Sequence, residues 1–157
     1  MLARRRAEAA TVTGVISDEI PGYFDQVGWQ YDRQRHDQFR TGFASDKGSW
    51  DMLVRVTDLM VSFTVPRYVE RTSKVPPGPI LNLALLRANH ELNLAKLGVD
   101  SDGDICLTVE IPADEFSVSQ FKDAIMALVH YADDFKDRLE AAVADDADDG
   151  VTSERVL

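Results

Sequence analysis

Three stretches between residues 39 and 65 alternate apolar and polar side chains with a period of two. This alternation is typical of strands that bury one face, and the short turns Ser45–Ser49 and Thr57–Asp58 predict an antiparallel meander. The apolar positions of the three strands are Phe39, Thr41 and Phe43; Trp50, Met52, Val54 and Val56; and Leu59, Val61, Phe63 and Val65. Alone in water the meander would expose its apolar face, so helices elsewhere in the chain must cover it. The pattern therefore predicts the α+β class.

A short helix is expected before the meander. Ser17–Asp18–Glu19 supplies a helix cap and acidic first-turn groups, Pro21 fits an early helical position, and Gly28 ends the run. The polar residues 29–38 are ambiguous between a loop and an extension of the first strand. The third strand is expected to stop at Pro66, and the proline-rich residues 66–79 are expected to be a connection within one domain.

A second helix is expected from Pro79 to about Asn93, because its apolar residues recur every three or four positions. The main stripe consists of Leu81, Leu85, Ala88 and Leu92, and it is widened by Ile80, Leu83 and Leu86. An apolar surface broader than one stripe requires two partners. We therefore expect this helix to pack on the sheet and, as a hypothesis, to form a homodimer interface through Leu81, Leu85, Ala88 and Leu92.

The remaining pattern is a second hairpin and a long last helix. Residues 95–99 and 105–111 alternate around the turn Asp100–Asp104, and Ser117 with Gln120 forms a capping box. The expected order is helix, three strands, helix, two strands, helix. The chain is long enough for one core, so we expect a single domain over residues 16–144, a disordered leader at residues 1–15 and a disordered acidic tail at residues 145–157.

Charge argues against two classes of partner. The 17 basic and 27 acidic residues give a formal net charge of −10, and residues 112–157 alone carry twelve acidic and four basic side chains. Nucleic-acid binding needs a basic stripe, which is absent, and anionic membranes are disfavoured for the same reason. The one basic cluster, Arg4–Arg6, lies in the expected leader and leads into no apolar segment of a secretory signal. Together with the single thiol, Cys106, this predicts a cytoplasmic protein.

The candidate chemical motifs are incomplete. Asp100, Asp102 and Asp104 resemble a calcium loop, but Gly103 comes too early and Ile111 stands where a glutamate ligand belongs, so a hairpin turn is the better interpretation. The tail residues Asp145, Asp149 and Gly150 fail in a similar way. No two of the histidines His36, His90 and His130 have zinc-ligand spacing, and no catalytic motif accompanies them. His130 and Asp134 favour a local helix-surface contact, and Cys106 has no positive charge nearby to activate it. The sequence thus predicts no enzyme, no cofactor and no metal.

The element order and several local marks resemble the YbjN family of bacterial sensory transduction regulators, whose fold is similar to that of type III secretion chaperones. The marks are Trp50 at the start of the LVRV strand, the proline-bearing connection, Arg87–Ala88–Asn89, the Asp102–Gly103 turn and Ala132–Asp133, within residues 39–143. The resemblance implies a type III secretion chaperone-like α+β fold and a homodimer that binds other proteins.

Three further apolar residues are candidate protein-binding contacts. Leu53 and Met60 are in phase with the polar positions of their strands, and Leu86 lies beside the main helical stripe. They form either scattered exposed side chains or an apolar binding patch, and both alternatives stay open. The first hypothesis is a cytoplasmic, non-enzymatic homodimer that binds a client protein by apolar contact and by exposed strand edges. The alternative is a regulatory domain that senses a small molecule in a pocket between sheet and helices.

Overall fold

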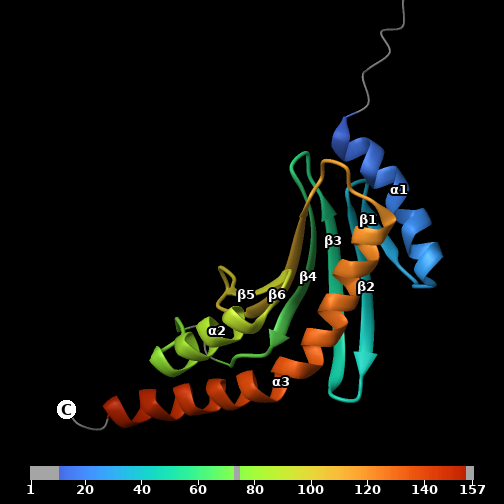
Figure 1. Cartoon of the computed structure of the whole chain (residues 1–157). Helices are drawn as coiled ribbons and strands as arrows, with labels where there is room; N and C mark the ends of the chain where they lie inside the picture. The colour runs from blue at the N-terminus through green and yellow to red at the C-terminus, as the bar shows by residue number, and fades with distance from the viewer. Residues whose placement is uncertain (1–10, 73–74, 155–157) are drawn as a thin grey trace, which may run out of the picture.

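The computed structural model describes residues 11–72 and 75–154 and contains a six-stranded antiparallel sheet with three helices (Figure 1). The elements in chain order are α1 (Val12–Val27), β1 (Asp32–Arg35), β2 (Gln38–Ser45), β3 (Gly48–Val56), β4 (Met60–Val69), α2 (Pro79–Glu91), β5 (Ala95–Val99), β6 (Ile105–Pro112) and α3 (Val118–Glu154). The strands lie in the order β1-β2-β3-β4-β6-β5. The predicted α+β class and element order are confirmed, with one strand more than expected.

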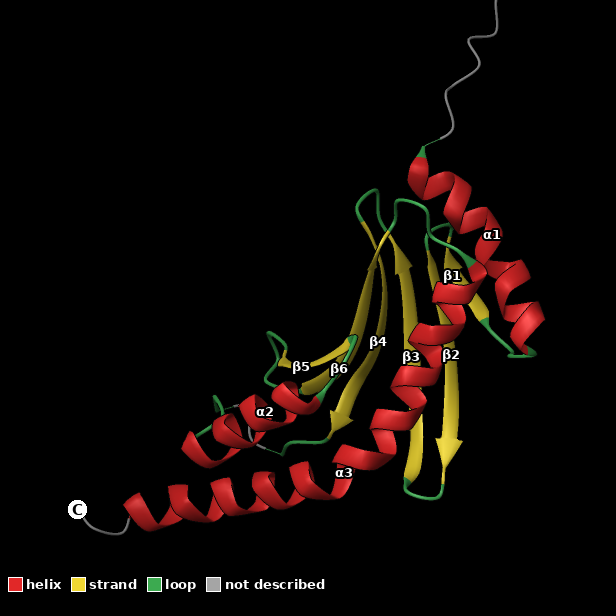
Figure 2. Cartoon of the chain, in the orientation of Figure 1, coloured by secondary structure: helices red, strands yellow, loops and turns green. Residues whose placement is uncertain are grey.

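The core lies on one face of the sheet. Inward residues of β2, β3, β4 and β6 alternate with exposed or half-buried ones, as the sequence pattern predicts. Phe24 of α1, Phe63 of β4 and Phe121 of α3 are completely buried, and the rings of Phe24 and Phe63 both lie edge-on to the ring of Phe121. The helices therefore cover the apolar face, and none of the described helices lies on the opposite face of the sheet (Figure 2).

The first helix starts earlier than the sequence indicates. Thr11 is the N-cap, and its hydroxyl accepts a hydrogen bond from the amide of Gly14 at 3.0 Å, so residues 12–15 of the expected leader are helical. Residues 1–10, with Arg4–Arg6, lie outside the described residues. Pro21 is consequently inside the helix, where it leaves the carbonyl of Ser17 without its usual donor. A guanidinium nitrogen of Arg33 fills this place at 3.2 Å.

Arg33 belongs to β1, the strand that sequence reasoning left ambiguous. Its four residues are all exposed and polar, so no alternation of apolar and polar side chains predicts a strand here. The segment is extended because it pairs with β2, with Asp32 opposite Arg40. Only this pairing identifies it as a strand.

Both predicted hairpins are present, with two local differences. Leu59 is 78% exposed in the β3–β4 turn, so it does not belong to the apolar face of the third strand. Strand β4 does not stop at Pro66 but continues to Val69 through an irregularity in its pairing with β6. Proline is tolerated there because a bulge removes the need for a ladder hydrogen bond.

The last helix begins as predicted and extends further than expected. The amide of Ser117 donates to the side-chain oxygen of Gln120 at 2.9 Å, and the amide of Gln120 donates to the Ser117 hydroxyl at 3.4 Å. Helix α3 continues to Glu154, so residues 145–154 of the expected tail are helical, and residues 155–157 lie outside the described part of the chain.

Candidate protein-binding surface on helix α2

The four predicted interface residues are buried within the chain itself. Leu81, Leu85, Ala88 and Leu92 have at most 8% of their surface exposed, because α2 packs on the distal half of α3 and on β5. The distal half of α3 also contributes buried apolar residues: Phe135, Leu139 and Ala142. This is a correction to the expected geometry, since a second chain could contact α2 only through its other side.

The other side of α2 carries an apolar ridge. Ile80, Leu83 and Leu86 are 37%, 47% and 68% exposed, and their spacing of three residues places them in a row along the helix surface. We call these three residues the α2 ridge. Leu86, one of the predicted protein-binding residues, lies at its end. The exposed side chains of Arg87 and His90 border the row.

Helix α3 holds α2 at both ends. The carboxylate of Asp146 accepts hydrogen bonds from the amides of Gly78 at 2.7 Å and Leu81 at 3.2 Å, so it caps a helix that has no cap of its own. Near the other end, Arg138 pairs with Glu91 at 2.9 Å. A Cβ atom at Gly78 would lie 2.6 Å from the Asp146 carboxylate, so a larger residue at this position would displace the capping side chain.

Asn89 fixes α2 to the edge of the sheet. Its side-chain oxygen accepts a hydrogen bond from the amide of Leu97 at 2.8 Å, and its side-chain nitrogen donates to the carbonyl of Leu97 at 3.0 Å. These backbone groups belong to β5, the edge strand of the described sheet, which pairs with β6. The carboxamide therefore occupies the place of a neighbouring strand and blocks part of an exposed sheet edge.

The connection from α2 to β5 contains a strained apolar residue. Leu94 has a φ of 67° and is 54% exposed, although a bulky side chain disfavours this left-handed backbone conformation. Val99, at the end of β5, is 38% exposed. Helix α2, this connection and β5 thus expose five apolar side chains in total.

The other two predicted contact residues lie elsewhere. Leu53 of β3 and Met60 of β4 are half-buried on the helix-free face of the sheet, in phase with Thr64, which pairs with Leu53. The structure does not bring them together with Leu86, which is on α2.

Cys106 is also on the helix-free face and is half-buried. Its burial, and then the nearby carboxylates of Asp100 and Asp104, raise the pKa of the thiol. The thiol is therefore kept protonated, which is the opposite of what a nucleophilic cysteine requires.

The acidic turn and the histidines have local roles. The side chain of Asp100 accepts hydrogen bonds from the amides of Asp102 and Asp104, both at 2.9 Å, and Gly103 adopts the left-handed conformation. This is the geometry of the predicted hairpin turn. His130 lies 3.2 Å from Asp134, one helical turn further on, in the exposed pair that the sequence indicated. Within the described residues no group of histidine, cysteine or acidic side chains is arranged to hold a metal ion.

A shallow hollow of about 480 Å³ lies over one end of the first hairpin. Its lining residues all belong to β2 and β3: Gly42, Phe43, Ala44, Ser49, Trp50 and Asp51. It is therefore not the pocket between sheet and helices that the small-molecule alternative requires. The described helices include none that is long and apolar enough to cross a bilayer.

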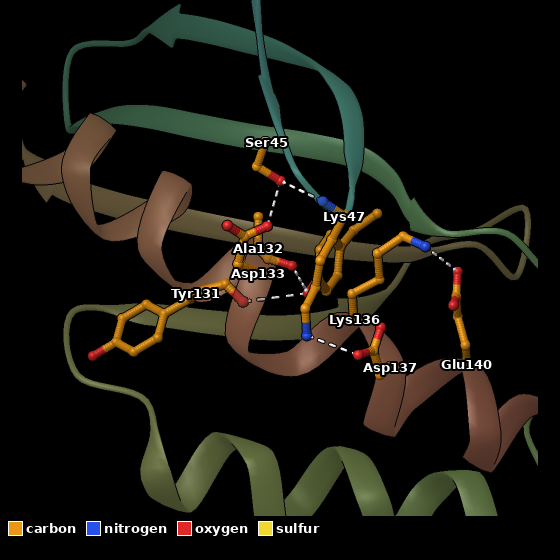
Figure 3. A network of polar contacts seen from close by, with 9 residues as sticks. Ser45, Lys47, Tyr131, Ala132, Asp133, Lys136, Asp137 and Glu140 are labelled. Atoms are coloured by element: carbon orange, nitrogen blue, oxygen red, sulfur yellow. Dashed lines mark hydrogen bonds and ion pairs between the residues drawn. The ribbon is translucent and has the colours of Figure 1, made fainter.

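A second set of polar contacts ties the tip of the first hairpin to α3 (Figure 3). The hydroxyl of Ser45 donates to Asp133, and Lys47 pairs with Asp137 at 2.7 Å. The hydrogen bond from Lys47 lowers the pKa of Asp137, whose carboxylate is exposed. This network fixes α3 over the sheet at the point where the helix leaves it.

Comparison with known families decides the relationship. The family model YbjN, described as "Putative bacterial sensory transduction regulator", matches residues 17–141. The chain belongs to the YbjN family. No curated protein sequence matches the chain.

Solved structures share this fold at low sequence identity. The ExsC–ExsE complex includes a chain 13% identical, with a TM-score of 0.57 over 82% of this chain and 96% of that one. The ExoU–SpcU complex of the type III secretion system of Pseudomonas aeruginosa includes one 18% identical, with a TM-score of 0.51 over 78% and 96%. YbjN from E. coli is 15% identical, with a TM-score of 0.49 over 86% and 92%. The family match confirms the expected relationship to YbjN proteins, and the chains in the ExsC–ExsE and ExoU–SpcU complexes confirm the expected fold.

Several of the residues that indicated the YbjN family connect elements of the fold. Asn89 blocks the edge of β5, Asp102–Gly103 forms the β5–β6 turn, and Asp133 anchors the first hairpin. Sequence reasoning missed two other residues with long-range contacts: Asp146, which caps α2, and Tyr68 of β4, whose hydroxyl donates to the carbonyl of Ala132 on α3. Neither belongs to a recognisable motif, because each acts on a segment more than 60 residues away.

Proposed function

We propose that this YbjN-family protein is a non-enzymatic protein-binding module, chaperone-like or regulatory, that acts as a homodimer in the cytoplasm. The observation that carries the proposal is the two-sided helix α2: one apolar stripe is buried within the chain, and the α2 ridge remains exposed on the other side. Exposed apolar rows of this kind mark protein interfaces. The lone, protonated Cys106 supports both the compartment and the absence of thiol chemistry.

The fold supports a role in protein binding. The chains of similar fold in the ExoU–SpcU and ExsC–ExsE structures were solved in complex with protein partners. We assign the α2 ridge to the dimer contact, where a two-fold axis would place the row against its own copy. We assign Leu53 and Met60, on the helix-free face, to contact with a client protein. Strand addition at β5 is disfavoured because Asn89 already occupies that edge.

The dimer is tested with the double variant Leu83→Asp/Leu86→Asp. Two charges on the α2 ridge should abolish association and leave the fold intact, because Leu83 is already 47% and Leu86 68% exposed. Light scattering after size exclusion should give twice the chain mass of 17.5 kDa for the parent and the single chain mass for the variant. Met126→Asp is the matched control, since Met126 is 63% exposed on α3 and should leave the dimer unchanged. A monomeric parent, or a double variant that stays dimeric, would remove the ridge from the proposal.

The client contact is tested separately with Leu53→Glu/Met60→Glu. A pull-down from native lysate with the parent as bait should retain a stoichiometric protein, which the variant should lose while its dimer mass is unchanged. Equal retention by both baits would show that this face does not bind the client.

A further inference from the structure

Helix α3 changes direction along its length. Figure 1 shows that its first part crosses the sheet and its later part runs beside α2, away from the sheet. The first part buries Phe121, Ile125 and Leu128 in the main core, whereas Phe135 and Leu139 belong to the part that packs with α2. The orientation of α2 relative to the sheet therefore depends on the bend between these two parts.

The hydroxyl of Tyr68 contacts the main chain of α3 between the two parts. It donates to the carbonyl of Ala132 at 2.6 Å and lies 3.3 Å from the carbonyl of Tyr131. Tyr68 is 2% exposed. Within a helix these two carbonyls accept from the amides of Phe135 and Lys136, and a side-chain donor that competes for them is a recognised cause of helix bending. Figure 3 shows Tyr131 and Ala132 beside the Ser45–Asp133 contact, which anchors the same turn of α3.

A bulge in β4 directs Tyr68 toward α3. Val65 pairs with Leu107 and Val69 pairs with Ile105, so β4 has three residues, Pro66 to Tyr68, opposite the single residue Cys106. Arg67 takes up the distortion with a φ of 47°. The insertion turns Tyr68 into the core in addition to the regular inward positions, which a continuous strand could not do. The indole N–H of Trp50 then fixes Tyr68 by donating to its carbonyl at 3.1 Å.

The hydroxyl of Tyr68 remains a hydrogen-bond donor to α3 at every physiological pH. Its burial, and then the charges of Asp133 and Glu140, raise the pKa of its hydroxyl above the ordinary value. The hydroxyl is therefore protonated at any physiological pH, and the hydrogen bond to α3 does not switch.

We propose that the β4 bulge and Tyr68 form a joint that sets the bend of α3 and thereby the position of the α2 ridge relative to the sheet. Tyr68 is a positioning residue in this joint. A role of this joint in binding rests on the proposed function. The joint itself does not depend on that function, because the bend of α3 is a property of the single chain.

The test measures the bend directly by electron–electron double resonance. In a Cys106→Ser background, spin labels are placed at Leu59→Cys and Ala144→Cys, two exposed positions in the β3–β4 turn and on the distal part of α3. Labelled protein is diluted with unlabelled protein so that only distances within one chain contribute. Tyr68→Phe removes the hydroxyl and keeps the ring, and we expect the mean distance to shift outside the parent distribution. Tyr23→Phe is the matched control, because the Tyr23 hydroxyl contacts Glu19 on α1 and should leave the distance unchanged.

An unchanged distance in a folded Tyr68→Phe variant would overturn the proposal. Should that variant fail to fold, hydrogen exchange on the parent protein decides the question. We expect the amides of Phe135 and Lys136 to exchange faster than those of Leu128 and Leu139, because Tyr68 competes for their acceptors. Uniform protection through this part of α3 would overturn the proposal as well. Because neither measurement involves a partner, a negative result can be distinguished from failure of the proposed function.

Discussion

A single side chain can satisfy a backbone group that the local sequence leaves without a hydrogen-bond partner. Pro21 removes a donor from α1, and the freed carbonyl of Ser17 is bound by Arg33. The same guanidinium also donates to the carbonyl of His36 at 2.7 Å and lies over the ring of Phe39. The Arg33 side chain thus supplies the donor that the Ser17 carbonyl lacks and attaches β1 to α1. This contact explains why a strand of exposed polar residues is ordered.

Removal of this side chain should therefore destabilise the fold. We expect Arg33→Ala to lower the free energy of unfolding by about 1–3 kcal/mol, because a partly buried carbonyl loses its donor. Arg35→Ala is the control, since Arg35 is exposed on the same strand and should change stability by less than about 0.5 kcal/mol. Urea unfolding followed by circular dichroism measures both, and equal effects for the two arginines would contradict the assigned role.

Tyr68 should make the protein sensitive to alkali. Its pKa is raised in the folded chain, so between the unfolded value of about 10 and the folded value the native state binds the proton and the unfolded state does not. Stability should therefore be fully present below pH 10 and should fall as the pH rises through this window. Tyr68→Phe should show a smaller decline between pH 9 and pH 11 in denaturant unfolding, and an identical decline would refute the prediction.

At the scale of elements, α2 is held by contacts that other elements supply. Its own N-cap residue provides no side-chain cap, and the amides of Gly78 and Leu81 donate to the carboxylate of Asp146 on α3 instead. Its side facing β5 is fixed by Asn89. Helix α2 therefore depends on its tertiary contacts, and it is stable only where the distal part of α3 and the edge strand β5 are both in place.

The cap from α3 predicts the effect of removing it. Asp146→Ala should cost about 1 kcal/mol, the usual value of an N-cap, because two amides at the start of α2 lose their acceptor. Asp145→Ala, at the exposed neighbouring position, should have no comparable effect. Thermal unfolding of the two variants makes the comparison, and a loss confined to Asp145→Ala would exclude this capping geometry.

Asn89 should protect the sheet edge as well as hold α2. In Asn89→Ala the amide and carbonyl of Leu97 become free, so we expect a loss of about 1–2 kcal/mol and increased self-association at high concentration. His90→Ala, one position further on the same helix and exposed, is the control for stability and should leave the free energy of unfolding unchanged. Denaturant unfolding and sedimentation velocity provide the two readings. An unaltered sedimentation profile together with unaltered stability would show that the edge needs no cover.

At the scale of the whole molecule, charge opposes the compact state. The net charge is −10, and the distal part of α3 contains a series of acidic residues: Asp133, Asp134, Asp137, Glu140, Asp145, Asp146, Asp148 and Asp149. Asp137 and Glu140 pair with lysines at the surface, but exposed pairs contribute little to stability. Repulsion along α3 should therefore outweigh attraction at low salt.

Added salt should consequently stabilise the protein. We expect the midpoint of thermal unfolding to rise between low ionic strength and about 0.15 M NaCl, where the screening length falls to about 8 Å. Potassium fluoride gives the control for specific chloride binding and should produce the same rise. A midpoint that falls with salt would mean that the surface ion pairs dominate instead.

The sequence by itself determined the parts of this protein that depend on neighbouring residues. Alternation gave the strands of the meander and the second hairpin, the Ser117–Gln120 box marked the start of α3, and the local marks placed the chain in the YbjN family. These features follow from periods, caps and turns, all of which act within a few positions.

The tertiary structure alone decided which side of α2 is buried, that β1 is a strand, that Asn89 and Asp146 hold α2, and that Tyr68 contacts α3. An apolar stripe does not say which partner covers it, and a polar segment gives no sign of pairing. Each of these outcomes depends on groups brought together by folding, as with Asp146 and Gly78, which lie 68 positions apart in the chain. Such contacts form only when folding brings distant segments of the chain together, so no local sequence pattern predicts them.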